Sequence, residues 1–426
     1  MVNYMRILIY QENKIGGHTD IFRQLNYNTL NDEINLYCNG IYTNAGNKVW
    51  LQGIVSELKT NDNEICFLEE NWDWEYINNH FDAIVYSTAN LLQRAHKNDI
   101  ARRANEFKHS RLPIYCISIG AQGELSEKPK DVIKGIEKEM GFFLDSIYNS
   151  GGEFGVRGCY TKEVLDCISR DNTAKVTGCP SIFQNGRDLE IKKKSIAFDG
   201  FKAILNGNVF LKDELITDSN VFIDQDVFSY EMYDYDIYER YNDRDFIKYC
   251  VTKFGLEKTR LFIFDKVKLF MSVPEWHFYL LENDYDFSFG SRIHGNICSL
   301  LSGVPALINV IDSRTWEMAD FYKIPYTYDV PHNKKELFCL YEDLDYSRFN
   351  QNYKIIYDNF NNFLLECKLI NRAMNENNIF WDKKLLPRSN QLISQRKETM
   401  KKYMKNNKSK IWLWDKERTI KEILKK

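Results

Sequence analysis

The sequence predicts an α/β protein of two Rossmann-like domains that face each other across a cleft, followed by a helical, basic C-terminal tail. Three observations lead to this fold class. Short apolar runs alternate with longer amphipathic stretches, which indicates parallel βαβ units rather than a sandwich. Residues 178–194, rich in Gly, Pro, Asn and Lys, divide the pattern into two similar series as a linker would. A chain of 426 residues is also too long for one ordinary core.

The first series predicts an N-terminal Rossmann-like domain over residues 1–185. Helical patterns are expected at Val49–Leu58 and Asp131–Asn149. The expected strands are Arg6–Tyr10, Glu33–Tyr37, Phe81–Tyr86, Leu112–Gly120 and Phe154–Arg157.

The second series predicts a C-terminal Rossmann-like domain over residues 195–343. Helices are expected at Pro274–Asn283 and Asn296–Ser302. Residues 344–426 read as a helical segment with one amphipathic helix at Tyr353–Asn371. Ligands are expected at the carboxyl ends of the strands, inside the cleft. The expected strands are Ser195–Phe198, Asn220–Ile223, Arg260–Phe264, Phe287–Phe289, Ala306–Asn309 and Thr327–Tyr328.

Composition removes several classes of protein. No stretch approaches the ~18 apolar residues of a membrane span, and the N-terminus lacks the pattern of a secretory signal, so a cytoplasmic protein is expected. The ten cysteines are spread singly, which predicts reduced thiols rather than disulfides or a zinc site. Neither a phosphate-binding P-loop nor a G-x-G-x-x-G after the first strand is present, which disfavours ATP and NAD enzymes.

The net charge of −3 hides a basic tail, residues 383–426. Such a segment attracts phosphates, anionic lipids or nucleic acid, but no nucleic-acid motif accompanies it, so no nucleic-acid partner is predicted. Near its end, Trp412, Leu413 and Trp414 stand beside Lys and Arg. Three interpretations stay open: peripheral contact with a membrane surface, packing on the domains, and an oligomer contact.

The segment most informative about chemistry is GSRIHGNICSLLSGVPALI, residues 290–308. A strand ends here in Ser291, Arg292 and His294, and a helix of small residues begins around Gly295. The free amides and the dipole of a helix start favour anions, and a guanidinium can bind a phosphate or carboxylate through two hydrogen bonds. An imidazole alongside can transfer a proton near neutral pH. The combination favours a site over the alternative, a strand-capping arginine beside a core histidine.

This segment resembles the signature of the polysaccharide pyruvyl transferases, a strand ending in S/T-R-x-H followed by a helix and G-x-P. Four further segments agree with that family in order and spacing: NAGN (44–47), YCISIGAQG (115–123), FGVRGCYTKEVL (154–165) and IDSRTWEMADFYKIP (311–325). One departure is Asn47, where many relatives carry Asp. If that Asp serves the acceptor, a different acceptor sugar is expected here.

The resemblance implies a fold similar to the GT-B glycosyltransferases and the transfer of pyruvate from phosphoenolpyruvate to a sugar of a surface polysaccharide or its precursor, forming a ketal. Phosphoenolpyruvate is a donor substrate, so no cofactor is expected, and no metal. The acceptor could be linked to a nucleotide or to a lipid, and the protein could lie peripherally at the inner face of the membrane.

On this hypothesis Arg157 and Arg292 clamp the donor from the two domains, and His294 is the general acid or the general base. The amides at the Gly295 helix start and in residues 120–123 would hold phosphate oxygens. His18, which follows two glycines after the first strand, is a further candidate site residue. The substrate-binding candidates are Gly120, Gln122, Gly295, Asn44, Gly46, Arg314 and Glu317.

Two other functions are weighed against this one. The first is a glycosyltransferase of the same fold, in which Arg292 grips the diphosphate of a sugar nucleotide and Glu317 binds a ribose. The second is a non-catalytic scaffold of a polysaccharide complex, which has no reason to keep a proton donor beside an anion site. The D-x-D pairs are attributed to chance and no metal is predicted from them: Asp224 and Asp226, Asp234 and Asp236, Asp284 and Asp286.

Overall fold

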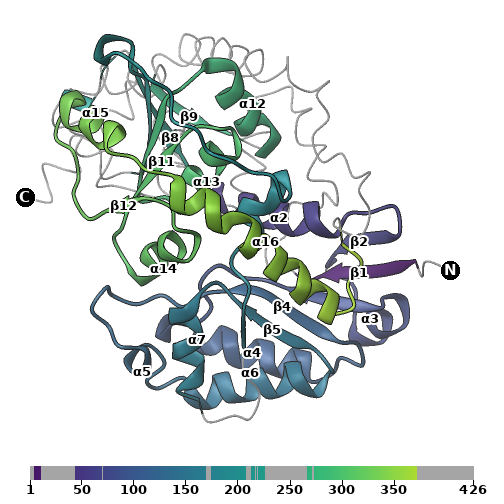
Figure 1. Cartoon of the computed structure of the whole chain (residues 1–426). Coiled ribbons are helices and arrows are strands. Elements are labelled where there is room, and N and C mark those ends of the chain that lie inside the picture. Colours follow the sequence, from purple (N-terminus) through teal and green to yellow (C-terminus); the bar gives the residue numbers. More distant parts are fainter. Residues whose placement is uncertain are drawn as a thin grey trace, which may run out of the picture.

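The computed structural model describes residues 4–10, 44–69, 71–168, 174–207, 213–215, 217, 219–225, 266–270 and 273–371. Within these residues the chain forms two parallel six-stranded sheets, stacked one above the other in Figure 1. The predicted α/β class with two parallel units is therefore confirmed. The proposed boundaries of the domains stay a prediction.

The first sheet has the strand order β2-β1-β3-β4-β5-β6. Its strands are β1 (Met5–Ile9), β2 (Asn63–Phe67), β3 (Ala83–Tyr86), β4 (Ile114–Ile119), β5 (Glu153–Val156) and β6 (Lys175–Val176). The α-helices described in this half are α2 (Gly46–Leu58), α3 (Trp74–His80), α4 (Lys97–Phe107), α5 (Pro129–Val132), α6 (Glu137–Asn149) and α7 (Cys159–Asp166).

The second sheet has the order β12-β11-β10-β7-β8-β9. Its strands are β7 (Ala203–Asn206), β8 (Asn220–Asp224), β9 (Val267–Leu269), β10 (Phe287–Gly290), β11 (Ala306–Asn309) and β12 (Tyr326–Thr327). The helices that accompany it are α12 (Val273–Asn283), α13 (Ile293–Leu301), α14 (Ser313–Tyr322), α15 (Lys334–Glu342) and α16 (Ser347–Glu366).

Most of the predicted strands that fall on described residues are confirmed within two residues at either end, but Ser195–Phe198 is wrong. A short 3₁₀ turn, η4 (Phe198–Gly200), lies there, and the strand is β7, which begins at Ala203. The strands β2 and β6 had not been predicted. Several expectations fall outside the described residues: the strands Glu33–Tyr37 and Arg260–Phe264, His18, the pair Asp234 and Asp236, Asp226, and the tail 383–426.

The segment predicted as a linker contributes to the core instead. Its residues Pro180–Asn185 form a 3₁₀ helix, η3, in which Ile182 and Phe183 are fully buried. The Phe183 ring packs against four aromatic rings, those of Tyr322, Tyr353, Tyr357 and Phe360. Gly and Pro in this segment thus shape a tight buried turn, not an exposed connection.

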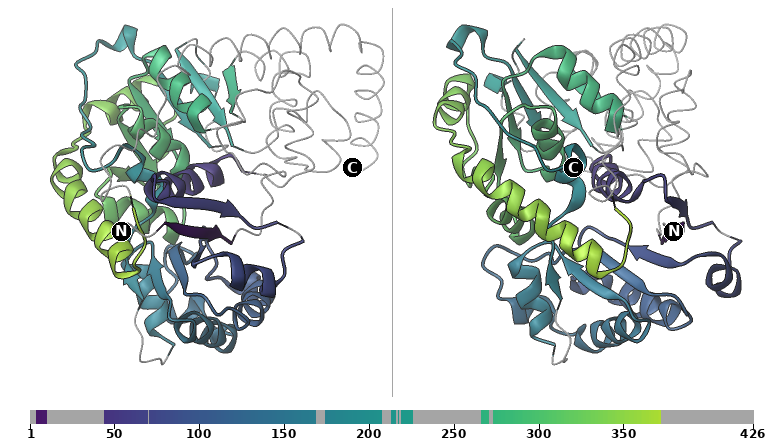
Figure 2. Two further views of the ribbon diagram at one scale, coloured as in Figure 1. Left: turned by 90° about the vertical axis from the view of Figure 1, so that its right-hand side faces the viewer. Right: turned by 45° about the vertical axis from the view of Figure 1, so that its right-hand side comes forward.

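One hydrophobic cluster runs through both sheets. It includes Ile7 of β1 and Phe289 of β10 and is completed by α2, η3 and α16. Helix α16 runs diagonally across both halves (Figures 1 and 2). Just beyond it, the carbonyl of Ile370 accepts a hydrogen bond from Asn63 Nδ2 at 2.6 Å, which returns the chain to the first sheet.

The described ranges contain no helix that combines the length and the apolar character needed to cross a bilayer. The eight cysteines described are all free thiols, as the sequence predicts.

Candidate active site

The turn between β10 and α13 is built by close backbone packing and one buried amide. Gly290 has φ +155°, and a Cβ there would overlap the backbone of Asn206. The side chain of Asn296 holds the turn, since its Nδ2 donates to the Gly290 carbonyl at 2.7 Å and its Oδ1 accepts from Ser288 Oγ at 2.8 Å. These contacts fix Arg292 as the N-cap of α13 and His294 in its first turn.

His294 is buried, with 7% of its surface exposed. Its Nε2 lies 3.8 Å from Cys179 Sγ, at the length of a weak contact to sulfur. Burial, and then the positive charges of Arg157 and Arg314, hold the pKa of His294 well below its usual value. The imidazole is therefore neutral at neutral pH and able to accept a proton.

Arg157, directly after β5, is the other predicted catalytic residue and is 1% exposed. Its Nε donates to the Ser118 carbonyl at 3.1 Å and to Ser118 Oγ at 3.2 Å. Both terminal guanidinium nitrogens are buried and have no hydrogen-bond partner among the described residues. Ser118 itself has φ +63°, a left-handed conformation that costs energy in a non-glycine residue. A buried cation with two unsatisfied donors and a strained support is typical of a ligand site.

Gly120 makes room for Arg157. A Cβ at this position would lie 2.5 Å from the Ala89 carbonyl oxygen and 2.9 Å from Arg157 Cδ. The following amides have partners within the protein: Ala121 donates to Thr161 Oγ1, Gln122 to the Leu92 carbonyl and Gly123 to Ser313 Oγ. The predicted contact of this loop with phosphate stays a prediction.

The side chain of Gln122 is also engaged. Its Oε1 accepts from Asn90 Nδ2 at 2.5 Å, and its Nε2 lies 3.5 Å from Asp312 Oδ2. Gln122 thus spans from the first sheet to the start of α14.

Gly295 was predicted to contact an anion through its amide, and that contact stays a prediction. Its amide donates to the Arg292 carbonyl at 3.1 Å, within the first turn of α13. A Cβ at Gly295 would overlap the side chains of Asn206 and Gln225, so the glycine is needed for close packing.

Gly46 lies beside His294, and Asn44 contacts Gly46. Asn44 Oδ1 accepts from the Gly46 amide at 2.8 Å and shapes the start of α2. A Cβ at Gly46 would lie 3.3 Å from His294 Cβ and 2.5 Å from Gln225 Oε1. Their contact with an acceptor sugar stays a prediction.

Arg314, in the first turn of α14, joins the cationic cluster. One terminal nitrogen donates to Asp312 Oδ2 at 3.2 Å, whereas Nε is buried without a partner. Burial lowers the pKa of Arg314; Asp312 opposes this, and the charges of Arg157 and Arg292 lower the pKa further. Arg157 and Arg292 therefore both act electrostatically on Arg314, an arrangement that suits an anionic ligand.

Both carboxylate oxygens of Glu317, which was predicted to bind substrate, accept hydrogen bonds from within the protein. Its Oε1 accepts from the Thr161 amide at 2.6 Å and its Oε2 from Thr161 Oγ1 at 2.7 Å. These bonds join α14 to α7, and the substrate-binding role expected for Glu317 stays a prediction.

Sequence reasoning did not single out several residues of this cluster. Cys179, Ser118 and Asn206 all contact predicted site residues. Ser118 lies in the segment 115–123 but was not singled out there, Cys179 and Asn206 belong to no recognised motif, and β7, which carries Asn206, had been placed too early. Among the described residues, the buried amide atoms Asn206 Oδ1 and Gln225 Nε2 have no hydrogen-bond partner. Asn206 directly follows the apolar run Ala203–Leu205, a signal that could have pointed to it, whereas Asp224 separates Gln225 from the apolar run before it.

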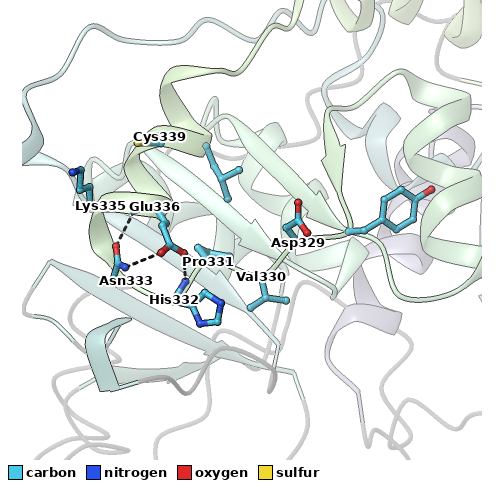
Figure 3. Close-up of a pocket in the computed structure, with 10 residues that line it drawn as sticks. Asp329, Val330, Pro331, His332, Asn333, Lys335, Glu336 and Cys339 are labelled. Carbon is cyan, nitrogen blue, oxygen red and sulfur yellow. Dashed lines mark hydrogen bonds between the residues drawn. The ribbon is translucent and has the colours of Figure 1, made fainter.

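A pocket of about 820 Å³ lies elsewhere, in the loop after β12 and the start of α15 (Figure 3). In it, Asn333 and Glu336 exchange hydrogen bonds, and the His332 amide donates to Glu336. The pocket follows β12, which lies two strands from β10 in the sheet. None of the predicted site residues lines it. Across the described ranges, no group of three or more potential metal ligands is found.

The family model for polysaccharide pyruvyl transferase matches residues 31–310, a range that holds the Arg157, Arg292 and His294 cluster. The chain belongs to the polysaccharide pyruvyl transferase family. It is therefore a transferase that acts in polysaccharide pyruvylation.

The solved structures that this chain resembles have low sequence identity to it. The S. aureus MnaA–UDP co-structure is 10% identical, with a TM-score of 0.37 over 82% of this chain and 91% of that one. The glycosyltransferase SnogD from Streptomyces nogalater is 11% identical, with a TM-score of 0.29 over 85% of this chain and 96% of that one. A comparison with curated proteins found no match.

Proposed function

We propose that this transferase moves the pyruvyl group of phosphoenolpyruvate to a sugar of a surface polysaccharide or its precursor and forms a ketal. One observation carries the proposal: in the part of the chain that the structure describes, the two terminal nitrogens of Arg157 are buried without hydrogen-bond partners, within electrostatic reach of His294 and Arg314. Buried donors of positive charge require an anion to offset their desolvation.

Phosphoenolpyruvate presents two anionic groups, a phosphate and a carboxylate. Arg157 extends from the end of β5 in the first sheet, and Arg292 and Arg314 stand at the starts of α13 and α14 beside the second. Guanidinium groups from two directions suit a ligand with two charged ends, because each can bind an oxyanion through parallel hydrogen bonds.

The reaction also needs proton transfer. The methylene carbon gains a proton, one sugar hydroxyl adds to C2, and a second hydroxyl displaces phosphate to close the ketal. The two sugar hydroxyls release two protons. One equals the proton that the methylene carbon takes up, and the other leaves with phosphate. The neutral His294 is suited to accept a proton from the attacking hydroxyl, and a bound anion raises its pKa so that the same ring can then donate.

The rival function, a glycosyltransferase using a sugar nucleotide, assigned ribose binding to Glu317. Both carboxylate oxygens of Glu317 are bonded to Thr161, so the group expected to hold the ribose is already occupied. The proposal does not depend on the carrier of the acceptor, for which a nucleotide and a lipid are both predicted alternatives. Contact of residues 383–426 with a membrane is a separate prediction.

Thermal stabilisation tests the donor. At about 100 times its dissociation constant, phosphoenolpyruvate should add about 2.7 kcal/mol to the free energy of unfolding. Arg157→Ala should abolish this gain. Arg187→Ala is the matched control, since Arg187 is an exposed arginine paired with Asp358, and it should retain the full gain.

A panel of uridine and cytidine sugars is titrated in the same way. Stabilisation by a sugar nucleotide together with none by phosphoenolpyruvate would favour the glycosyltransferase and reject the pyruvyl donor.

A further inference from the structure

Glu317 is a buried carboxylate that joins the two halves of the molecule. It belongs to α14 beside the second sheet, is 3% exposed, and accepts two hydrogen bonds from Thr161 of α7, at 2.6 and 2.7 Å. Thr161 is the third residue of α7, where unpaired amides and the helix dipole favour a negative charge. A Cβ at Gly158, the N-cap of α7, would lie 2.5 Å from Glu317 Cγ, so the glycine permits this approach.

The contact continues to Arg157 by two routes. Along the chain, α7 begins only two residues after Arg157. Through space, Thr161 Oγ1 also accepts from the Ala121 amide at 3.0 Å, and the preceding Gly120 packs against the Arg157 side chain. The backbone of Arg157 and the wall beside its guanidinium are therefore both tied to the residue that Glu317 binds.

A second pair of hydrogen bonds reinforces the same junction. The Gly123 amide donates to Ser313 Oγ at 2.9 Å, and the Ser313 amide donates to the Gly123 carbonyl at 3.1 Å. Ser313 precedes Arg314, so the start of α14 is fastened to the loop after β4.

We infer that Glu317 is a positioning residue, which fastens α14 to the start of α7 and so sets the Arg157 guanidinium relative to Arg314 and His294. The inference rests on the proposed function in that the ligand held there is the donor. On this inference Glu317 does not touch the substrate but sets the position of α14 relative to α7, and so the distance between the arginines of the two sheets.

The protonation of Glu317 provides a readout. The charged or titratable groups that face it are Arg157 from the end of β5 and Tyr160 and Glu163 from α7. Burial raises the pKa of Glu317 to about 7, against the opposing effects of the Thr161 hydrogen bonds and Arg157. Because this pKa lies above the ordinary value of 4.5, the contribution of the carboxyl group to stability is full below pH 4.5 and is lost as the pH rises through 7.

The experiment compares kcat and KM for phosphoenolpyruvate in wild type, Glu317→Gln, Glu317→Ala and Thr161→Val. Glu317→Ala and Thr161→Val should raise KM about tenfold or more, because a small displacement of a clamping group is costly. Glu317→Gln keeps one acceptor oxygen and should retain more of the activity. Because glutamine does not titrate, the melting temperature of this variant should lack the fall between pH 4.5 and 7 that the carboxyl group gives wild type. Asp73→Ala is the control, since it removes the cap of α3 on the same sheet and should change only stability.

Unchanged KM and kcat in Glu317→Ala and Thr161→Val, with melting temperatures lowered as in Asp73→Ala, would overturn the inference. If wild type does not use phosphoenolpyruvate, the donor assignment fails, and inorganic phosphate becomes the probe of the Arg157 site. Weaker phosphate binding in both variants then supports the positioning role, and equal binding in all the proteins rejects it.

Discussion

At the scale of single residues, the environment of Arg157 lowers the stability of the ligand-free protein and favours the binding of an anion. Its Nε is satisfied by Ser118, but its terminal nitrogens are not satisfied by any described group. Functional sites commonly carry such a cost, because the same group is stabilised once its ligand arrives.

Arg157→Met tests this directly. Without donor, the variant should be more stable than wild type by about 1 kcal/mol, since it removes a buried charge with unsatisfied donors. With phosphoenolpyruvate, it should gain no stability. Unfolding by urea with and without the donor measures both quantities, and a variant less stable than wild type in the absence of donor would contradict the assignment.

Gly120→Ala probes the space that Arg157 occupies. The new Cβ would lie 2.5 Å from the Ala89 carbonyl oxygen and 2.9 Å from Arg157 Cδ, so the guanidinium must move. We expect kcat/KM for phosphoenolpyruvate to fall about 10²-fold. Gly200→Ala is the control because a Cβ at Gly200 meets nothing within 4 Å, and equal steady-state kinetics in the two variants would show that Gly120 does not shape the site.

At the scale of elements, the helices α12 and α13 are joined by a buried histidine whose titration affects stability. His277 Nδ1 lies 2.8 Å from Ser302 Oγ, just past the end of α13, and burial lowers the pKa of His277 to about 4. Since the unfolded chain takes up the proton first, stability is intact above pH 6.5 and is lost as the pH falls towards 4.

Over that range wild type should lose about 3 kcal/mol relative to His277→Asn, from about 2.5 pKa units at 1.36 kcal/mol each. Denaturant unfolding at pH 7 and pH 4 measures the difference. Parallel losses in the two proteins would show that His277 titrates normally.

The sequence was sufficient for elements and motifs whose signal is local. Strand β11 is a short apolar run between a Pro and a polar loop, and Arg292 and His294 stand two residues apart directly after another strand. The contacts that assemble the site are not local. Thr161 and Glu317 are 156 positions apart, and Cys179 and His294 are 115 apart, so no pattern within one segment reveals them.

At the scale of the whole molecule, the two sheets share one hydrophobic cluster, and the segment expected to separate them lies inside it. Phe183 of η3 is fully buried among aromatic rings of α14 and α16. The shared core predicts that the two sheets unfold together.

Phe183→Ala should therefore destabilise the entire molecule by about 3–5 kcal/mol in a single transition. Calorimetry checks this by comparing the calorimetric and van't Hoff enthalpies, which agree when unfolding is two-state. Two separate transitions, with only one shifted by the substitution, would show that the sheets are independent.

The central claim, pyruvyl transfer from phosphoenolpyruvate, is tested most directly by following the C2 carbon of the donor. The purified protein is incubated with phosphoenolpyruvate labelled with ¹³C at C2 and a panel of free, nucleotide-linked and lipid-linked sugars, and the products are read by NMR and phosphate release. The cluster of Arg157, Arg292 and His294 predicts a ketal carbon that appears with one phosphate per transfer and is absent in Arg157→Ala. Intact phosphoenolpyruvate with every acceptor, together with turnover of a sugar nucleotide, would contradict it.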